Sequence, residues 1–115
     1  MPIDALQTVD IIEVMENFLS RRRPPAHIRH KLDIAYKIEN QSIIIYEIRE
    51  AFGKPGKCIE SPVAKATFIK TKNSWKVFWM RANLKWYGYE PRPVVTSLSA
   101  FVKLVEQDKH HCFWG

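Results

Sequence analysis

The sequence has few of the residues that mark several large classes of protein. Two cysteines occur among 115 residues, at positions 58 and 112, and the four glycines are scattered at positions 53, 56, 88 and 115. Cysteines this far apart do not suggest a disulfide framework, and scattered glycines leave no glycine-rich phosphate loop. No run approaches the roughly 18 apolar residues of a membrane span, and no cation precedes Arg21, unlike in a signal or transit peptide. These absences predict a cytoplasmic protein with reduced thiols.

The composition that remains is typical of one globular domain, residues 1–115. Hydrophobic residues make up 46%, charged residues 26% and aromatic residues 12%, which is enough for a core of large side chains. The net charge of +6 is unevenly spread, because residues 1–20 hold four acids and no cation. Residues 21–31 hold five Lys/Arg residues and no acid, and residues 70–92 hold six against the single Glu90. An excess of this size favours polyanionic partners.

Two segments have the spacing of amphipathic helices. Asp4 predicts the start of the first, which runs to about Arg23 and ends before Pro24 and Pro25. Ser97 predicts the start of the second, over residues 98–107. Each segment has apolar residues at three- and four-residue spacing, which predicts a buried stripe. The stripes are Leu6, Val9, Ile12, Met15 and Leu19, widened by Ile11, Val14 and Phe18, and then Leu98, Phe101, Val102 and Val105.

Five segments between the helices have the alternation of strands. Their connections are short and contain no helix, so the strands are expected to run antiparallel. We therefore predict an α+β fold with an N-terminal helix, a five-stranded antiparallel sheet and a C-terminal helix. The strands are predicted at 31–38, 42–50, 63–70, 75–81 and 84–90, with turns at 39–41 and 71–74, a loop at 51–62 and an extended segment at 90–95.

Two of these strands are apolar on both faces. Strands of this kind need cover on both sides, and two modest helices do not cover two faces of a sheet. We therefore expect a homodimer that buries the second face. The alternating sets are Ile43 and Ile45 against Ile44, Tyr46 and Ile48, and then Trp75, Val77 and Trp79 against Phe78 and Met80.

Several segments together resemble a bacterial family of small proteins that is known as a domain of unknown function. They are QSIIIYEIRE (41–50), SPVAKATFIKTKNSWKVFWMRANLKWYGYEP (61–91) and DKHHCFWG (108–115). Members of that family are similar in a W-x-x-x-W-M-R-A-x-L-K-W-x-x-Y-x-P core and a C-terminal C-F-W-G. The resemblance covers nearly the whole chain and implies a compact bacterial cytosolic domain. It implies no activity, and so it assigns no catalytic or binding residues.

Two clusters of cations are candidates for contacts with phosphates. Lysine and arginine gain affinity for phosphates by releasing counterions, without reading the base sequence. His27 and His30 add to the first cluster when they are protonated. The alternative is that all these cations are solvated, at a helix end and on the outer face of an ordinary sheet. The clusters are Arg21, Arg22, Arg23, Arg29 and Lys31, and then Lys70, Lys72, Lys76, Arg81 and Lys85.

The aromatic residues of the central segment allow two interpretations. Exposed rings on a sheet stack on unpaired bases, and Trp79 with Trp86, or Tyr87 with Tyr89, could serve in this way. The alternation of the strand instead places Trp79 in a core or an interface, and burial is the favoured interpretation. Arg81 is expected either to reach a base edge or to pair with Glu47. The rings of Phe113 and Trp114 are expected to pack on the core.

Metal binding and nuclease chemistry are the remaining alternatives. His27 and His30 lie about 80 residues from His110, His111 and Cys112, whereas structural zinc sites match two compact ligand pairs. We therefore predict no metal site and no cofactor.

A restriction-type nuclease needs a strand Asp followed by Glu-x-Lys, and Asp33 with Glu47 and Arg49 is the nearest match. Because a guanidinium stays protonated, Arg49 is a poor substitute for the lysine. A structural pair between Glu47 and Arg49 is expected instead, and no residue is assigned as catalytic.

The leading hypothesis is a homodimer that is not an enzyme and binds nucleic acid, double-stranded DNA rather than RNA, in a regulatory or accessory role. The alternative is a protein-interaction module with no nucleic-acid role, and a metal-dependent nuclease-like enzyme stands third. The sequence does not determine which of the cations share one face.

Overall fold

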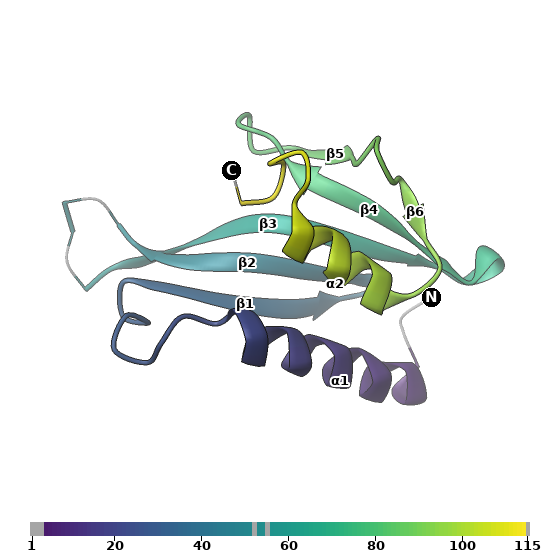
Figure 1. The fold of residues 1–115 in the computed structure, drawn as a ribbon, viewed down its shortest axis with the longest axis horizontal. Coiled ribbons are helices and arrows are strands. Elements are labelled where there is room, and N and C mark those ends of the chain that lie inside the picture. The colour runs from purple at the N-terminus through teal and green to yellow at the C-terminus, as the bar shows by residue number, and fades with distance from the viewer. Residues whose placement is uncertain (1–3, 52, 55, 115) are drawn as a thin grey trace.

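Two helices cover one face of an antiparallel sheet in the computed structural model, which describes residues 4–51, 53–54 and 56–114 (Figure 1). The predicted α+β architecture is confirmed, with one short strand more than expected. No helix of the described residues is long and apolar enough to cross a membrane. The elements are α1 (Ala5–Arg22), β1 (Leu32–Glu39), β2 (Ser42–Glu50), β3 (Cys58–Ile69), the 3-10 helix η1 (Lys70–Lys72), β4 (Ser74–Met80), β5 (Trp86–Gly88), β6 (Val94–Val95) and α2 (Leu98–Gln107).

Both helices begin at the caps that the sequence predicts. The carboxylate of Asp4 accepts a hydrogen bond of 2.8 Å from the backbone N–H of Gln7, and the Ser97 hydroxyl accepts one of 3.1 Å from Ala100. Each cap satisfies one of the N–H groups that a helix start leaves without a partner. Helix α1 ends at Arg22, and the extended backbone of its C-cap, Arg23, leads directly into Pro24.

The strands follow one another in the sheet in the order β1-β2-β3-β4-β5. The outer edge of β4 is covered twice, because β5 pairs with its last residues and β6 with its first. Between these two pairings, Val77 donates to the carbonyl of Pro93 and accepts from the N–H of Tyr89, both at 2.9 Å. The segment that was predicted to be merely extended therefore returns to the same edge as a sixth strand.

Strand β3 begins earlier than predicted, and this corrects the long loop expected at 51–62. The two glycines and two prolines of this segment are typical of a loop, yet Pro62, which has no N–H to donate, pairs with Tyr46 inside the strand. An irregularity in the register leaves Val63 as the extra residue, and both Val63 and Ala64 are buried in the core. Of the predicted loop, Phe52 and Pro55 lie outside the described residues.

Strand β5 is shorter than the predicted 84–90. Leu84 has a φ of 62°, which is the left-handed region, so the strand cannot include it. The hydrogen bond from the Leu84 N–H to the carbonyl of Arg81 instead closes a turn between β4 and β5. Only Trp86–Gly88 remains as regular strand.

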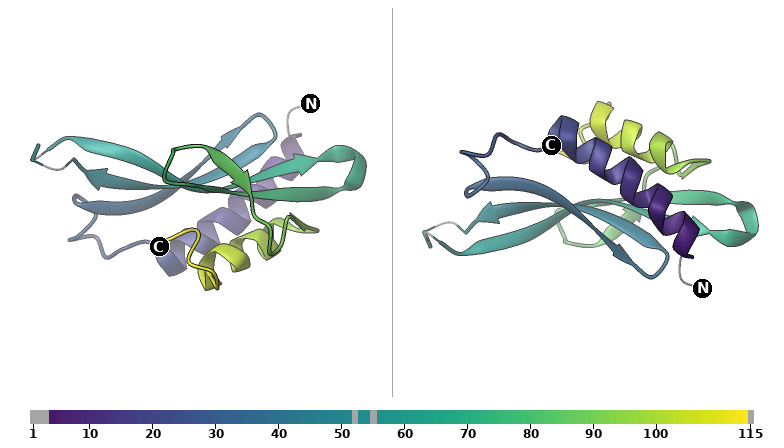
Figure 2. Two further views of the ribbon diagram at one scale, coloured as in Figure 1. Left: turned by 90° about the horizontal axis from the view of Figure 1, so that it is seen from above. Right: turned by 90° about the horizontal axis from the view of Figure 1, so that it is seen from below.

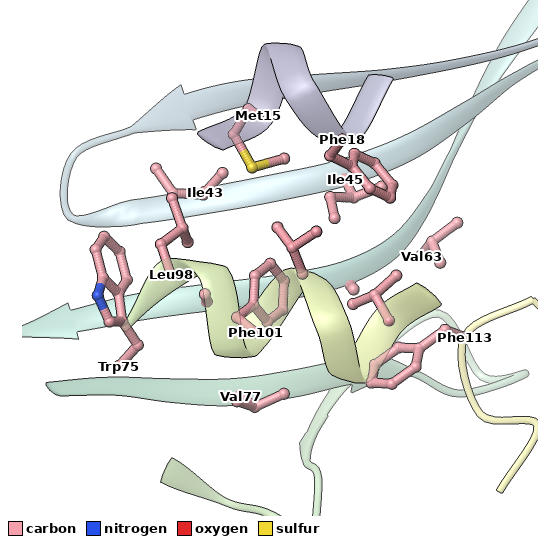
Figure 3. Packing of buried hydrophobic residues seen from close by; sticks show 14 of the residues in the cluster. Met15, Phe18, Ile43, Ile45, Val63, Trp75, Val77, Leu98, Phe101 and Phe113 are labelled. Atoms are coloured by element: carbon pink, nitrogen blue, oxygen red, sulfur yellow. The ribbon is translucent and has the colours of Figure 1, made fainter. Parts of the chain in front are cut away.

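The core lies between the sheet and the two helices, and the figure shows apolar side chains from both layers meeting there (Figure 3). The predicted alternation is confirmed, because Ile43 and Ile45 face this core from β2, and Trp75 and Val77 face it from β4. The predicted apolar side of α2 is buried as well. Met15, Phe18, Phe101 and Val105 are fully buried.

The stripe predicted for α1 is only partly the buried one. The side chains of Leu6, Val9 and Ile12 are 83%, 62% and 43% exposed, whereas Ile11, Met15 and Phe18 are buried. The physical reason is that each three-residue step falls about 60° short of a full turn, so a row of such steps moves around the helix. Helix α1 therefore has an apolar stripe on each side, and the sheet covers only one of them.

The C-terminal segment packs on the core, as predicted for Phe113 and Trp114. Asp108 ends α2 with a left-handed φ of 41°, and its carboxylate accepts from the N–H groups of Phe113 and Trp114 at 3.1 and 3.0 Å. The Trp114 indole donates to the carbonyl of Val105 at 2.8 Å. Phe113 becomes 7% exposed and joins the buried cluster.

We expect Asp108→Ala to lower the free energy of unfolding by about 1–3 kcal/mol, because two backbone N–H groups next to the core lose their acceptor. Asp108→Asn should cost less, since it keeps an acceptor oxygen and tolerates the left-handed backbone. Urea denaturation of both variants measures the difference. An alanine variant within about 0.5 kcal/mol of the natural protein would show that the carboxylate does not hold the segment.

Candidate functional site

One face of the sheet is turned away from both helices, and we call it the open face (Figure 2). The strand register places one set of residues on this face. Lys37 pairs with Ile44, Ile44 with Lys65, and Lys65 with Phe78, so these four side chains form a line across β1 to β4. Beside Asp33, Glu39, Ser42, Glu60 and Val94, the open face includes Ala35, Lys37, Ile44, Tyr46, Ile48, Lys65, Thr67, Lys76, Phe78, Met80 and Trp86.

Lysines and aromatic rings are in contact on the open face. The ammonium of Lys65 lies 4.8 Å from the ring centre of Phe78 and 5.0 Å from that of Trp86, and the ammonium of Lys37 lies 5.3 Å from the ring of Tyr46. These are distances at which a cation is attracted to the face of a ring. Burial lowers the pKa of Lys65, which is a cation held partly out of water. The open face therefore presents positively charged side chains that lie over aromatic rings.

Among the described residues, these lysines differ in their acidic partners. Lys37 lies 3.7 Å from a carboxylate oxygen of Glu39 and 3.5 Å from one of Glu60, so its charge is shared. Lys65 and Lys76 have no carboxylate within 4.0 Å in the part of the chain that the structure describes. Their charges are available to an anion from outside.

The first predicted cation cluster is largely engaged within the protein. Arg21 donates to Glu106 at 2.6 Å, and Arg23 makes two hydrogen bonds of 2.8 and 2.7 Å to Asp33. The guanidinium of Arg22 lies 5.6 Å from the ring centre of Trp114, and Arg29 donates to the carbonyl of Pro24. Lys31 is exposed. Four of the five residues therefore have contacts that stabilise the fold.

The second predicted cluster is divided among several places. Lys76 lies on the open face, and Lys70 and Lys72 are exposed in η1, at the end of the β3–β4 hairpin. Arg81 and Lys85 lie in the turn between β4 and β5. Figure 1 shows η1 at one end of the molecule, away from the C-terminal end of α1. The ten predicted residues therefore do not form one continuous surface.

Arg81 does not pair with Glu47, one of the two partners expected for it. Glu47 is bound instead by Arg49 at 2.9 Å, which confirms the structural pair expected from the sequence. The guanidinium of Arg81 lies over the rings of Tyr87 and Trp79, at 4.7 and 5.6 Å from their centres. These rings face the helix side of the sheet, so Arg81 is separated from the open face.

The aromatic pairs considered for base stacking are also divided. Trp79 packs against the core and Tyr89 is fully buried, which agrees with the favoured interpretation for Trp79. Trp86 pairs with Met80 on the open face, with Lys65 across its ring. Lys65 was not among the cations predicted to bind; strand alternation places it on the face opposite Ala64 and Ala66, and the register brings it next to Phe78.

The carboxylates considered for nuclease chemistry have structural partners. Asp33 accepts from Arg23 and from the backbone N–H of Ile34, and Glu47 accepts from Arg49. The hydrogen bonds from Arg23, helped by the Ile34 N–H, hold the pKa of Asp33 below its usual value despite its burial. Among residues 4–51, 53–54 and 56–114, no three His, Cys, Asp or Glu side chains are grouped so that they could hold a metal ion.

The architecture is that of a two-layer α+β protein, with helices on one face of an antiparallel sheet and an uncovered face on the other. The chain belongs to the family described as "Domain of unknown function (DUF3024)", whose model matches residues 3–115. The resemblance noted from the sequence is thus confirmed at the level of an uncharacterised family. No curated protein and no solved structure matches the chain.

The ion pair between Arg23 and Asp33 should make the free energy of unfolding depend on pH in the acidic range. Because the pKa of Asp33 is lower in the folded protein, its contribution is complete above the unfolded value of about 4 and is lost as the pH falls below it. We expect Arg23→Gln to unfold more easily at pH 7 and to lose less stability between about pH 5 and pH 2. Arg22→Gln is the matched control, and urea denaturation across this range measures both. Identical pH profiles for the two variants would contradict the role of the pair.

Proposed function

We propose that this chain binds single-stranded nucleic acid, DNA in preference to RNA, on its open face, and that it does so without catalysing a reaction. We propose in addition that the protein is bacterial and cytoplasmic, as the resemblance implies. The two free cysteines support a cytoplasmic setting, because thiols stay reduced there. The observation that carries the binding proposal is the contact of Lys65 with the rings of Phe78 and Trp86 on an uncovered sheet face.

The chemistry of the open face suits a flexible strand of nucleotides. Proteins that bind single strands combine cations that follow the phosphates with rings on which unpaired bases stack. Phe78, Trp86 and Tyr46 are half-buried and supply ring surface, and Lys65 and Lys76 supply charge without a carboxylate partner among the described residues. An excess of six positive charges over the whole chain adds attraction at longer range.

Further cations extend this surface along the direction of β4. The seven residues of β4 span about 23 Å, and the exposed Lys70 and Lys72 lie at the hairpin that leads into the strand. A strand of several nucleotides that follows β4 would meet η1, Lys76 and then the rings of Phe78 and Trp86.

A duplex suits this surface less well than a single strand. Sequence-reading proteins place a helix or a two-stranded ribbon in the major groove, whereas both helices here pack on the opposite face of the sheet. The rings of the open face are useful only to bases that are not stacked in a duplex. The cations of the first predicted cluster, which were expected to contact phosphates, are mostly engaged with the protein itself.

The binding test measures fluorescence anisotropy with a labelled oligothymidylate of about 20 nucleotides, with matched RNA and duplex probes, over a range of salt. We expect Lys65→Gln with Lys76→Gln to weaken binding by about tenfold and to reduce the salt slope by about 1.4, since each lost phosphate contact removes about 0.7. The matched control is Lys103→Gln with Lys109→Gln, which removes two exposed charges from the helix side. Trp86→Leu should weaken binding about fivefold or more through lost stacking.

Three results would contradict the proposal. One is the absence of binding at about 50 mM salt with tens of micromolar protein, which would favour a protein-interaction module instead. Another is an equal loss of affinity in the two double variants, because the effect would then depend on net charge alone and not on the open face. The third is a stronger affinity for the duplex than for the single strand, which would favour binding of duplex DNA through the first cation cluster.

We also propose that the chain acts as a homodimer, with the contact made by the outer stripe of α1 and not by the open face. The support is the exposure of Leu6, Val9 and Ile12, which form an apolar stripe on the side of α1 opposite the core. In a two-fold contact centred on Val9, antiparallel helices bring Leu6 of one copy opposite Ile12 of the other. This arrangement leaves the open face free for a ligand.

We expect Val9→Asp to convert the dimer to a monomer, because two buried carboxylates would meet at the centre of the contact. The mass measured by light scattering should fall from twice the 13.5 kDa of one chain to 13.5 kDa. Val94→Asp, at an exposed valine of β6, is the matched control and should leave the mass unchanged. A mass of 13.5 kDa for the natural protein at all concentrations would remove the dimer.

A further inference from the structure

A pocket of about 540 Å³ lies on the helix side of the sheet, between the β4–β5 hairpin, the segment that leads to β6 and the C-terminal segment. Its volume is within the range of sites for small molecules. Trp79 and Tyr87 contribute rings, and Pro91 and Pro93 contribute apolar surface. Arg81 also lines the pocket. The pocket is separated from the open face by the sheet itself.

The guanidinium of Arg81 lies beside two aromatic rings of the pocket. It lies 4.7 Å from the ring centre of Tyr87 and 5.6 Å from that of Trp79. The Tyr87 hydroxyl accepts from the side-chain amide of Asn83 at 2.8 Å, and Asn83 accepts from the N–H of Lys85 at 3.1 Å. The backbone N–H of Arg81 donates to Lys85 across the same turn. The ring against which the guanidinium stacks is therefore fixed by the turn.

The guanidinium has no anionic partner among the described residues. No carboxylate lies within 4.0 Å of it, and its side chain donates no hydrogen bond to another described residue. A stacked guanidinium keeps its edge N–H groups free, and their fork matches two oxygens of a phosphate or a carboxylate. Arg81 therefore offers N–H groups to an anion at the wall of a pocket with aromatic sides.

The other walls restrict which anion fits. The rings and the prolines favour a ligand with a flat apolar part. Glu90 lines the same pocket, so it repels a second negative group and accepts hydrogen bonds from amino or ring N–H groups. A planar ring with N–H donors that carries one phosphate combines these properties.

We propose that this pocket binds a nucleoside monophosphate, with the phosphate on Arg81 and the base beside the rings of Trp79 and Tyr87. The same chemistry is presented by a free nucleotide and by the phosphorylated end of a strand. The site stands apart from the proposed function, because none of its residues belongs to the open face. Cys112 also lines the pocket, and burial raises the pKa of its thiol, so the cysteine contributes surface and not a thiolate.

The test is isothermal titration calorimetry of the full chain with 5′-GMP and 5′-AMP at up to about 5 mM, beside guanosine and inorganic phosphate. We expect the monophosphates to bind at least about tenfold more tightly than guanosine or phosphate alone, because each of these lacks one half of the recognised chemistry. Arg81→Gln should lose at least about tenfold, and Arg81→Lys should remain weak since an ammonium lacks the fork. Arg92→Gln is the matched control, because Arg92 is exposed and does not line this pocket.

Several results would overturn this site. The natural protein with no heat of binding at about 5 mM monophosphate would do so, as would an Arg81→Gln variant that binds as well as Arg92→Gln. If inorganic phosphate bound as tightly as 5′-GMP, the proposed contact between the base and the rings of Trp79 and Tyr87 would be contradicted. Arg81 is exposed, so its variants should keep the circular dichroism spectrum and the melting temperature of the natural protein.

Two further arms separate the sources of the ligand and the two proposals. A 5′-phosphorylated oligonucleotide that binds more tightly than its unphosphorylated form, with the difference lost in Arg81→Gln, would identify a strand end as the ligand. Equal binding of the two forms would leave the free nucleotide as the ligand. Lys65→Gln with Lys76→Gln should leave 5′-GMP binding unchanged, so failure on the open face and failure in the pocket are distinguishable.

Discussion

Phe18 of α1 and Phe101 of α2 are fully buried in one cluster with Ile43 and Ile45 of the sheet (Figure 3). This packing holds both helices on a single face and makes that face the only core of the described residues. The other face then carries apolar side chains that no helix covers, such as Phe78 and its neighbours on the strands. Successive side chains of a strand point to opposite faces of the sheet. The core residues of each strand therefore determine which of their neighbours lie on the open face.

The cations show how sequence neighbours acquire different roles in three dimensions. Arg21 and Arg23 are close in the chain, yet one joins α1 to α2 and the other joins the end of α1 to β1. Lys65 and Lys76 are eleven residues apart, on the two strands of one hairpin, and pairing between these strands brings them to the same face. Charge density along the chain is therefore a poor guide to charge density on this surface, and pairing across the sheet decides which cations are available.

Local rules predicted much of the fold, and the failures have physical causes. The caps at Asp4 and Ser97 and the alternation in β2 and β4 depend on near neighbours, so they could be read from the sequence. The start of β3 could not, because the irregularity that admits Pro62 depends on the partner strand. Helix α1 is apolar on both sides, and only contact with the sheet decides which side is buried. The candidate site was predicted least well, since it depends on residues brought together across strands.

The outer edge of β4 limits how this protein can associate. Strands β5 and β6 take up that edge with a few residues each, and the segment between them contains Pro91 and Pro93, which cannot donate to a neighbouring strand. A further strand from another chain would find almost no regular backbone to pair with there. The sheet is thereby protected on this side against growth into the edge-to-edge assemblies that precede aggregation, although its face stays open.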